Sequence, residues 1–277
     1  MSLRVPVRRS AGHVRRQRTV RRASPRLAPA RAAAALVMLA AAAAGYGLTA
    51  SPAFAVRDVA YATPPTFTDP TAVRSALGLT GGAAENIFRL ATDDLAARLA
   101  ALPSVAAATV SVALPGTLRV DLTEREPIMV WQIGGRRLLA DAGGRLFSLP
   151  ASAAGEARVA RLPTIGDQRA ASSGLQPGDR LDPLDVDVAT RLASLKPADV
   201  GSSAKSLAVV VDDSDGFTLR ALPAGWIAVF GFYAPDLRDP GIVPGQVRLL
   251  KSLLAGRETT IARVVLASDR SGTYTTR

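Results

Sequence analysis

The sequence of 277 residues contains no cysteine and a single histidine, His13. Without cysteine the chain cannot form disulfides, thiol nucleophiles or zinc–thiolate sites, although an oxidising compartment tolerates such a chain. Because the one imidazole lies near the N-terminus, the rest of the chain lacks a histidine base or ligand, and a Ser-His catalytic pair is excluded. Stability must come from packing, for which a hydrophobic content of 48% is sufficient.

Acidic residues are absent from residues 1–31, which hold ten arginines. The formal net charge of +11 arises almost entirely there, because the remaining 246 residues carry 24 basic and 23 acidic side chains. A nucleic-acid-binding domain would present its basic residues on a folded face, so this distribution argues against one.

Charged residues are also absent between Arg31 and Arg57. As a helix, these 25 residues would extend about 37 Å, enough to cross a hydrocarbon core of ~30 Å. We predict a basic cytoplasmic tail over residues 1–31 and a transmembrane helix over residues 32–55. The later domains would then lie outside the cytoplasm, because positive residues stay inside. A cleaved signal peptide is the alternative, since residues 53–55 read Ala-Phe-Ala, the spacing of a cleavage site.

The segment 56–126 alternates between strand and helix patterns. VRDVAY begins a strand, and two amphipathic helices follow, the first capped by Thr68 or Asp69 and the second by Thr92. Two alternating runs around Pro115-Gly116 predict a hairpin. The expected order is β-α-α-β-β, a three-stranded sheet with two helices on one face.

The segment 127–277 predicts a second, mostly antiparallel β domain with helices. Residues 150–180 are rich in Ala, Gly, Ser and Pro and are expected to be loop. We expect a last strand at the edge of this domain, ARVVLAS, followed by a short polar end, TYTTR. The other expected strands are IMVWQI, RRLLADAGGRLF, SLAVVVD, GFTLRAL and WIAVF, and the helices are DPLDVDVATRLASL and VPGQVRLLKSLLAG.

The hairpin carries an ordered pattern, P-x-V-x-x-A-x-V followed by P-x-x-L-x-V-x-V-x-E-R-x-P. The positions are filled by Pro103, Val105, Ala108, Val110, Pro115, Leu118, Val120, Leu122, Glu124, Arg125 and Pro127. Over residues 56–165 the chain resembles the extracytoplasmic part of the bacterial cell-division family FtsQ, called DivIB in many Gram-positive species. The resemblance implies an α+β chain: one membrane helix, a POTRA domain and a β domain.

The resemblance also implies a non-enzymatic scaffold of the division septum, without cofactor, metal, nucleic acid or small-molecule substrate. Its partners would be other cell-division membrane proteins, including small coiled-coil proteins of the FtsB and FtsL type. An edge strand leaves N–H and C=O groups that a partner strand can complete. The predicted partner-binding residues are Arg263, Val264, Val265, Leu266, Ala267, Ser268, Gly272 and Tyr274 in the terminal region, and Val110 and Val112 in the hairpin.

Three motifs offer alternative chemistry. Ser202 and Lys205 fit the S-x-x-K spacing of penicillin-binding enzymes, but no K-T-G follows. The acidic run at 212–216 resembles a calcium loop but lacks carboxylates at the outer positions, and is expected to be a hairpin turn. Glu124 and Glu126, two residues apart on a strand, would share a face and could in principle do acid–base work. We favour a solvated or ion-paired hinge between domains.

Two other functions compete with the division scaffold. A POTRA protein of outer-membrane assembly or transport would need many alternating barrel strands after residue 127, and the remaining ~150 residues are interrupted by helices. A secreted cell-wall protein released by signal peptidase after Ala55 is the other.

Overall fold

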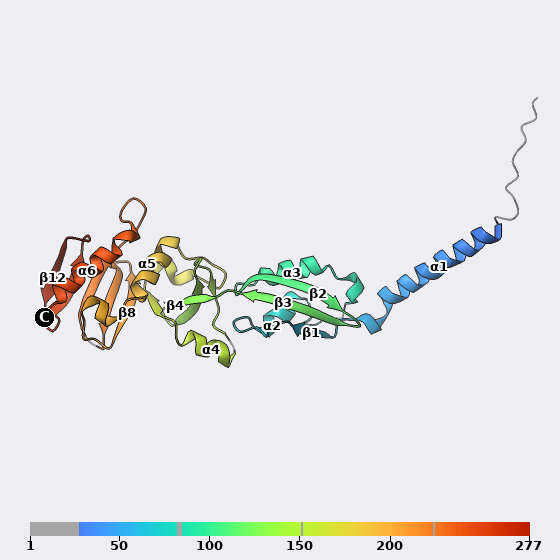
Figure 1. Ribbon diagram of the computed structural model, residues 1–277, viewed down its shortest axis with the longest axis horizontal. Coiled ribbons are helices and arrows are strands. Elements are labelled where there is room, and N and C mark those ends of the chain that lie inside the picture. Colours follow the sequence, from blue (N-terminus) through green and yellow to red (C-terminus); the bar gives the residue numbers. More distant parts are fainter. Residues whose placement is uncertain (1–27, 82–84, 151, 224) are drawn as a thin grey trace, which may run out of the picture. The chain divides into compact units, whose positions relative to one another are not determined.

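The computed structural model describes residues 28–81, 85–150, 152–223 and 225–277, and the chain divides into two units, Met1–Ala50 and Ser51–Arg277. In the first unit the described residues form one helix, α1 (Ala28–Ala50), of which Pro29–Ala50 is long and apolar enough to cross a membrane (Figure 1). The helix ends at Ala50, within the predicted span of residues 32–55, and Pro52 begins a short 3-10 turn, η2 (Pro52–Phe54). Most of the predicted basic tail lies outside the described residues.

A three-stranded sheet opens the second unit. Its strands are β1 (Asp58–Tyr61), β2 (Val105–Ala113) and β3 (Thr117–Glu124), in the order β1-β3-β2, with β1 parallel and β2 antiparallel to β3. Between β1 and β2 lie α2 (Pro70–Ala76), the 3-10 turn η3 (Ile87–Arg89) and α3 (Thr92–Ala100). This confirms the predicted β-α-α-β-β order.

The two helices α2 and α3 differ in how their N-termini are capped. Asp69 caps α2 by accepting a hydrogen bond from the Thr71 N–H at 2.8 Å. The predicted Thr92 cap is wrong, because Thr92 is the first residue of α3 and the preceding Ala91 offers no side-chain acceptor. Both helices pack on one face of the sheet, since alternate residues of β3 share a core with them. That core contains Val73 and Leu77 from α2, Leu95 and Leu99 from α3, and Leu118 and Val120 from β3.

A nine-stranded sheet forms the rest of the unit, in the order β12-β11-β10-β9-β8-β7-β4-β5-β6. Five of its eight neighbouring pairs are antiparallel, as predicted for a mostly antiparallel domain. The strands are β4 (Pro127–Ile133), β5 (Arg136–Asp141), β6 (Leu146–Phe147), β7 (Thr164–Asp167), β8 (Ser206–Asp212), β9 (Gly216–Leu222), β10 (Ile227–Gly231), β11 (Ile261–Leu266) and β12 (Gly272–Thr276). The helices are α4 (Ala153–Val159), α5 (Pro183–Ala193) and α6 (Val243–Leu254), with 3-10 turns η4 (Ala170–Gly174), η5 (Pro197–Val200) and η6 (Pro240–Ile242).

Two segments predicted to be irregular are regular. Residues 150–180 contain α4 and β7, and β7 lies in the interior of the sheet, between β4 and β8. The terminal TYTTR is not an irregular end, because residues 272–276 form β12 and pair antiparallel with β11. The strands β7 and β12 have four and five residues, so pairing partners distant in sequence determine their structure.

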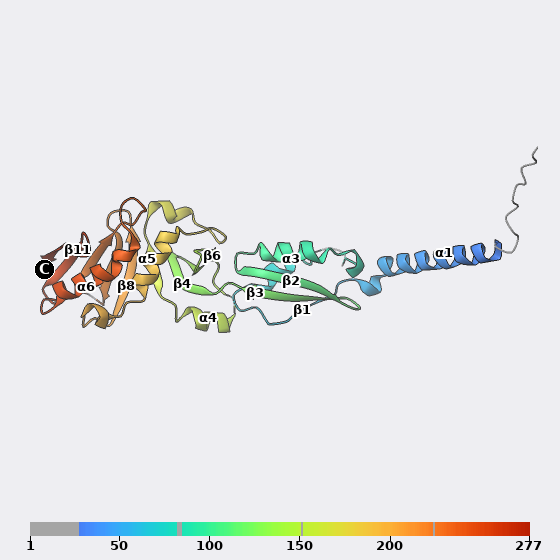
Figure 2. The same ribbon diagram turned by 45° about the horizontal axis from the view of Figure 1, so that its top comes forward.

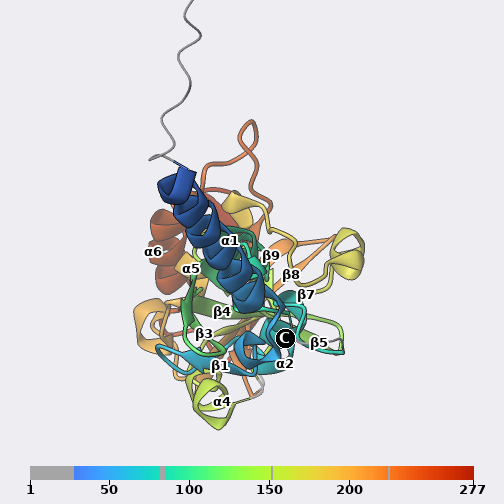
Figure 3. The same cartoon turned by 90° about the vertical axis from the view of Figure 1, so that its right-hand side faces the viewer.

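The two faces of the nine-stranded sheet carry separate cores. On one face, α5 and α6 cover the sheet (Figures 2 and 3). The core on that face includes Trp131, Trp226 and Phe230. On the other, α4 helps to bury a smaller cluster of Val130, Leu139, Phe147 and Val159 together with Phe67, which comes from the loop after β1. The alternation between Val130 and Trp131 along β4 thus serves both cores.

Candidate protein-binding edges

The strand β12 is an edge strand, because among the strands of the described residues it pairs with β11 alone. The Ser271 carbonyl accepts from the Ser268 N–H at 3.0 Å, and the Arg277 N–H donates to the Thr260 carbonyl at 2.9 Å. Alternate residues of a strand direct their backbone groups to the same side. The intervening Tyr274 and Thr276 therefore direct their N–H and C=O groups away from β11, toward the open side.

The surroundings of this edge are partly apolar. Tyr274 lies opposite the buried Val264 in the register and so on the α6 face of the sheet, with 41% of the residue exposed. Its ring is 5.8 Å from the Arg257 guanidinium. Leu249 and Leu253 of α6 are half-buried, and both approach the start of β12 closely enough to contact a β-carbon at Gly272. A strand added here would meet this apolar border.

The structure places the predicted residues of β11 inside the sheet rather than at its edge. The parallel neighbour β10 and the antiparallel neighbour β12 both pair with β11, so the expected edge strand ARVVLAS is wrong. Val264 and Leu266 are buried, whereas 37% of Val265 is exposed. Arg263 forms an ion pair with Asp215 at 2.5 Å. Of the predicted terminal residues, Gly272 and Tyr274 belong to the edge strand itself.

Two more of the predicted residues follow β11. The Ala267 carbonyl accepts from the Arg238 guanidinium at 2.9 Å. The Ser268 hydroxyl accepts from the N–H groups of Arg270 and Ser271, at 3.1 and 3.0 Å. Both residues therefore shape the turn from β11 to β12.

A buried glutamine, which the sequence patterns do not reveal, supports this end of the sheet. The Gln246 side chain on α6 donates to the carbonyls of Phe230 and Leu266, at 3.2 and 3.1 Å, where β10 and β11 end. The Tyr233 hydroxyl donates to Gln246 Oε1 at 2.7 Å, and burial raises the pKa of Tyr233 to about 12, so the hydroxyl stays protonated. The position of β11, and hence of β12, depends on these bonds.

The three-stranded sheet has two edges of its own, β1 and β2. Val110 lies opposite the buried Val120 and is half-buried, so its side chain belongs to the core face, whereas 38% of the next alternate residue, Val112, is exposed. At the hairpin tip 65% of Leu114 is exposed. A partner could therefore pair with the open backbone edge of β2 and contact the exposed Leu114 at the tip of the hairpin.

Glu124, at the end of β3, is the anchor of the loop that follows β1. Its carboxylate accepts hydrogen bonds from the N–H groups of Thr66, Phe67 and Thr68, at 2.7, 2.8 and 2.6 Å. Charge-assisted bonds of this kind are the stronger ones in proteins. They hold Phe67 where its ring packs edge-on against Phe147, with centroids 6.3 Å apart.

Arg125 and Glu126 have different partners. Arg125 pairs with Asp141 of β5 at 2.9 Å, and Glu126 reaches Arg158 of α4 at 3.3 Å. The expectation that Glu124 and Glu126 share a strand face is wrong, because β3 ends at Glu124. Residues 124–126 thus join the two sheets by ion pairs and hydrogen bonds. The carboxylate of Glu124 binds the loop after β1, and that of Glu126 binds α4.

The comparison with known proteins agrees with this architecture. Residues 54–125 match the model of the family described as POTRA domain, FtsQ-type. The chain is 42% identical over 72 residues to the cell division protein FtsQ of Koribacter versatilis (strain Ellin345), which covers 26% of this chain and 21% of that protein. It is 26% identical over 188 residues to the cell division protein FtsQ of Chloroflexus aurantiacus (strain ATCC 29366 / DSM 635 / J-10-fl), which covers 68% of this chain and 59% of that protein.

The chain contains a POTRA domain of the FtsQ type and is similar to cell division proteins named FtsQ. Its POTRA domain of the FtsQ type contains the three-stranded sheet. The aligned regions span less than two thirds of the length of either FtsQ relative.

The S-x-x-K motif of this FtsQ-like chain is part of a structural cluster. The hydroxyls of Ser202 and Ser203 donate to Glu258, as do the Ser203 N–H and the Trp226 indole N–H. Although partial burial opposes it, these hydrogen bonds lower the pKa of Glu258 to about 2. The carboxylate therefore stays ionised and ties the loop between α6 and β11 to the loop before β8. Ser202 is engaged with Glu258, and no interaction joins it to Lys205 in the described structure.

The acidic run at 212–216 is a hairpin turn. Asp212 accepts from the N–H groups of Ser214 and Asp215, at 2.9 and 2.7 Å, and Asp213 accepts from the Ala170 N–H at 2.8 Å. Although partial burial opposes it, hydrogen bonds from the turn hold the pKa of Asp212 below its usual value. Within the described residues no group of three or more metal-ligating side chains gathers at this turn or elsewhere.

A buried ionic cluster in the predicted loop was also missed. Arg169 bridges Asp167 of β7 at 2.9 Å and Asp185 of α5 at 2.6 Å, and the Trp131 indole N–H donates to Asp167 at 3.0 Å. Burial raises the pKa of Asp185, whereas for Asp167 the hydrogen bonds from Arg169 outweigh burial and lower the pKa. An Arg two residues after an Asp is too common a pattern to reveal this cluster from sequence.

Proposed function

We propose that this protein is a bitopic, non-enzymatic scaffold of bacterial cell division that binds other septal membrane proteins through strand addition at β12. The observation that carries the proposal is the open side of β12, where Tyr274 and Thr276 direct their backbone groups outward. A strand from a partner would complete these groups and extend the nine-stranded sheet by one strand. Through such contacts the scaffold would link early and late division proteins.

The border of β12 favours a partner strand with alternating apolar residues. Side chains of an added strand on the α6 face would lie beside Tyr274, and further side chains could contact the half-buried Leu249 and Leu253. Small coiled-coil division proteins of the FtsB and FtsL type are the partners that the similarity to FtsQ proteins favours. The POTRA edge β2, with Val112 and Leu114 exposed, is proposed as a second surface.

The proposed topology has the N-terminus in the cytoplasm and both sheets outside it. The ten arginines before α1 and the apolar length of α1 support this orientation. Because the chain has no cysteine, Ser2→Cys and Ser271→Cys each introduce a unique thiol for a membrane-impermeant maleimide. We expect Ser271→Cys to react in intact spheroplasts and Ser2→Cys to react only after permeabilisation; the reverse pattern would refute the topology.

The strand-addition proposal is tested by a matched pair at Thr276. Proline removes an outward N–H and is tolerated on the open side of an edge strand, whereas alanine keeps the N–H and removes the side chain. Losing this hydrogen bond and leaving a partner carbonyl unpaired should lower affinity roughly tenfold. We expect Thr276→Pro in the full-length tagged protein to recover far less partner from membranes than Thr276→Ala. Equal recovery, with both variants folded by circular dichroism, would refute pairing at β12.

Depletion tests the cellular role independently. Cells that lose the protein should form filaments or chains, because septum formation would lack its scaffold. Normal division after depletion would refute the division role whatever the outcome at Thr276.

A further inference from the structure

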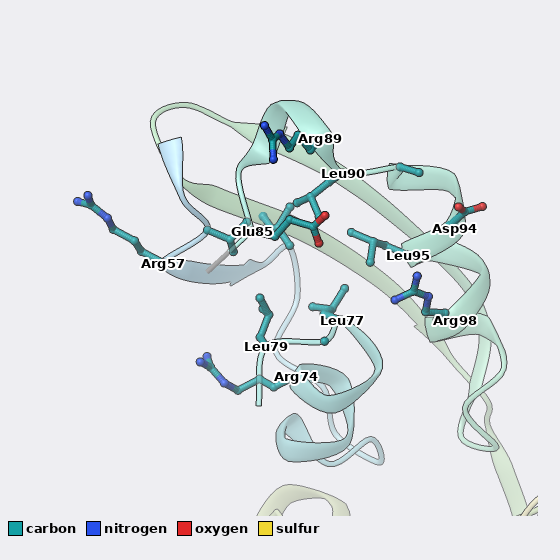
Figure 4. Close-up of a pocket in the computed structure, with 14 residues that line it drawn as sticks. Arg57, Arg74, Leu77, Leu79, Glu85, Arg89, Leu90, Asp94, Leu95 and Arg98 are labelled. Carbon is teal, nitrogen blue, oxygen red and sulfur yellow. The ribbon is translucent and has the colours of Figure 1, made fainter. Parts of the chain in front are cut away.

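A pocket of about 370 Å³ opens in the POTRA domain beside α2, η3 and α3. Leucines from several elements, among them Leu77 and Leu95, lie in its middle, and arginines stand around them (Figure 4). Arg74 comes from α2, Arg89 from η3 and Arg98 from α3, and Figure 4 shows Arg98 pointing toward the leucines. The pocket therefore combines an apolar interior with a cationic rim.

The cationic rim is unusual for this domain. Residues 51–126 contain six arginines, no lysine and eight acidic residues, so the segment is net negative. Four of the six arginines, Arg57 and the three named above, line this one pocket. Among the described contacts, Arg74, Arg89 and Arg98 form no ion pair or side-chain hydrogen bond, so their guanidinium groups are available to a ligand.

Two carboxylates also line the pocket. Figure 4 shows Glu85 near its centre and Asp94 turned away from it. Four arginines against two acids leave the pocket net positive, but Glu85 opposes an anion bound in the middle. Its carboxylate forms no hydrogen bond or ion pair with the described residues, so its charge can be removed without breaking a polar bond of the fold.

We propose that this pocket binds a phosphate group, that of an anionic phospholipid headgroup. Guanidinium groups bind phosphate through paired N–H donors, and the leucines can contact the apolar methylene groups of the lipid. The inference rests on the proposed membrane span: Arg57 follows Ala50, the last residue of α1, by seven positions. At that boundary the phosphates a chain meets are lipid headgroups, and basic residues there bind anionic lipid.

The test uses the full-length protein in nanodiscs of neutral lipid containing a phosphatidylglycerol analogue with a photoreactive headgroup. Labelling is mapped to residues 75–98 by mass spectrometry, which separates the pocket from the arginine tail. Arg98→Gln, and Arg74→Gln with Arg98→Gln, should each lower labelling, roughly fivefold per arginine removed. Arg119→Gln is the matched control, because Arg119 is an exposed arginine of β3 outside this pocket. Unchanged labelling in the pocket variants, or an equal loss in the control, would overturn the proposal.

A second variant reads the sign of the ligand charge. Glu85→Gln should increase labelling, since it removes the charge that opposes an anion; a decrease would overturn the proposal by indicating an ammonium-bearing headgroup. Excess inorganic phosphate at constant ionic strength distinguishes the sources. If inorganic phosphate reduces labelling, the site recognises phosphate itself. If labelling persists, the site recognises the phosphate within the lipid headgroup. Either result upholds phosphate recognition. Unaltered partner recovery beside absent labelling would refute this pocket alone and leave strand addition at β12 standing.

Discussion

Replacing Glu124 with alanine removes the carboxylate that holds residues 66–68. Three backbone N–H groups lose their acceptor at distances of 2.6 to 2.8 Å. Hydrogen bonds to a charged group contribute ~1.5–3 kcal/mol each, but these three share one carboxylate, and water can rehydrate part of the loop. We therefore expect a loss of about 3 kcal/mol in the free energy of unfolding. The loop also carries Phe67, which is 5% exposed, so the smaller core should loosen with it.

Hydrogen exchange at the three amides is the most specific assay. A loss of about 3 kcal/mol corresponds to exchange about a hundredfold faster at residues 66–68. The melting temperature of the protein should fall by roughly 6 to 12 °C. Glu126→Ala is the matched control, since the exposed pair with Arg158, with side chains 81% and 54% accessible, should contribute less than about 0.5 kcal/mol. Unchanged exchange in Glu124→Ala, or an equal effect in the control, would refute the anchoring role.

Three further predictions concern the nine-stranded sheet. Because the folded pKa of Glu258 is lowered from 4.5 to about 2, its contribution to stability is present above pH ~4.5 and lost as the pH falls toward 2. The difference in melting temperature between the wild type and Glu258→Gln should therefore shrink over that range, and a constant difference would contradict it. Arg169→Gln leaves Asp167 buried without its partner cation and should destabilise the protein by about 3 kcal/mol in urea unfolding; a change below about 1 kcal/mol would indicate that the cluster is dispensable. Gln246→Leu leaves two carbonyls at the ends of β10 and β11 without donors, so it should destabilise by about 2–3 kcal/mol and speed amide exchange in β12; slow exchange there would show that β12 does not depend on the glutamine.

The POTRA domain could be predicted from sequence because its elements are local and periodic. Alternation around Pro115-Gly116 indicates a hairpin, and leucine spacing indicates α3. The helix α5 begins as expected, since Asp182 caps it and Pro183 is its first residue. In each case the signal lies within the element itself.

The elements that were missed depend on contacts distant in sequence. The strand β7 has only four residues and is fixed by parallel neighbours on both sides. The residues of β12 are polar, and their polarity alone predicts an irregular tail. Pairing with β11 makes them a strand. The roles of Gln246 and Glu124 likewise come from backbone groups that only the tertiary structure brings to them.

The candidate edge strand β12 could likewise be predicted only in part from the sequence. The resemblance to FtsQ predicts that partners bind in the terminal region. The pairing of the strands decides which strand there has an open edge. Gly272 and Tyr274 lie in the edge strand, whereas Val264 lies in an interior strand. Strand order across a sheet is not encoded in the local pattern of any one strand.

Amide hydrogen exchange along β12 tests strand addition most directly. In the free protein Thr273 and Thr275 should exchange slowly, because their N–H groups face β11, and Tyr274 and Thr276 should exchange rapidly. On adding the extracytoplasmic segment of an FtsB- or FtsL-type partner, we predict that Tyr274 and Thr276 become protected while the other two change little. Binding that leaves the amides of Tyr274 and Thr276 in rapid exchange would contradict partner pairing at β12.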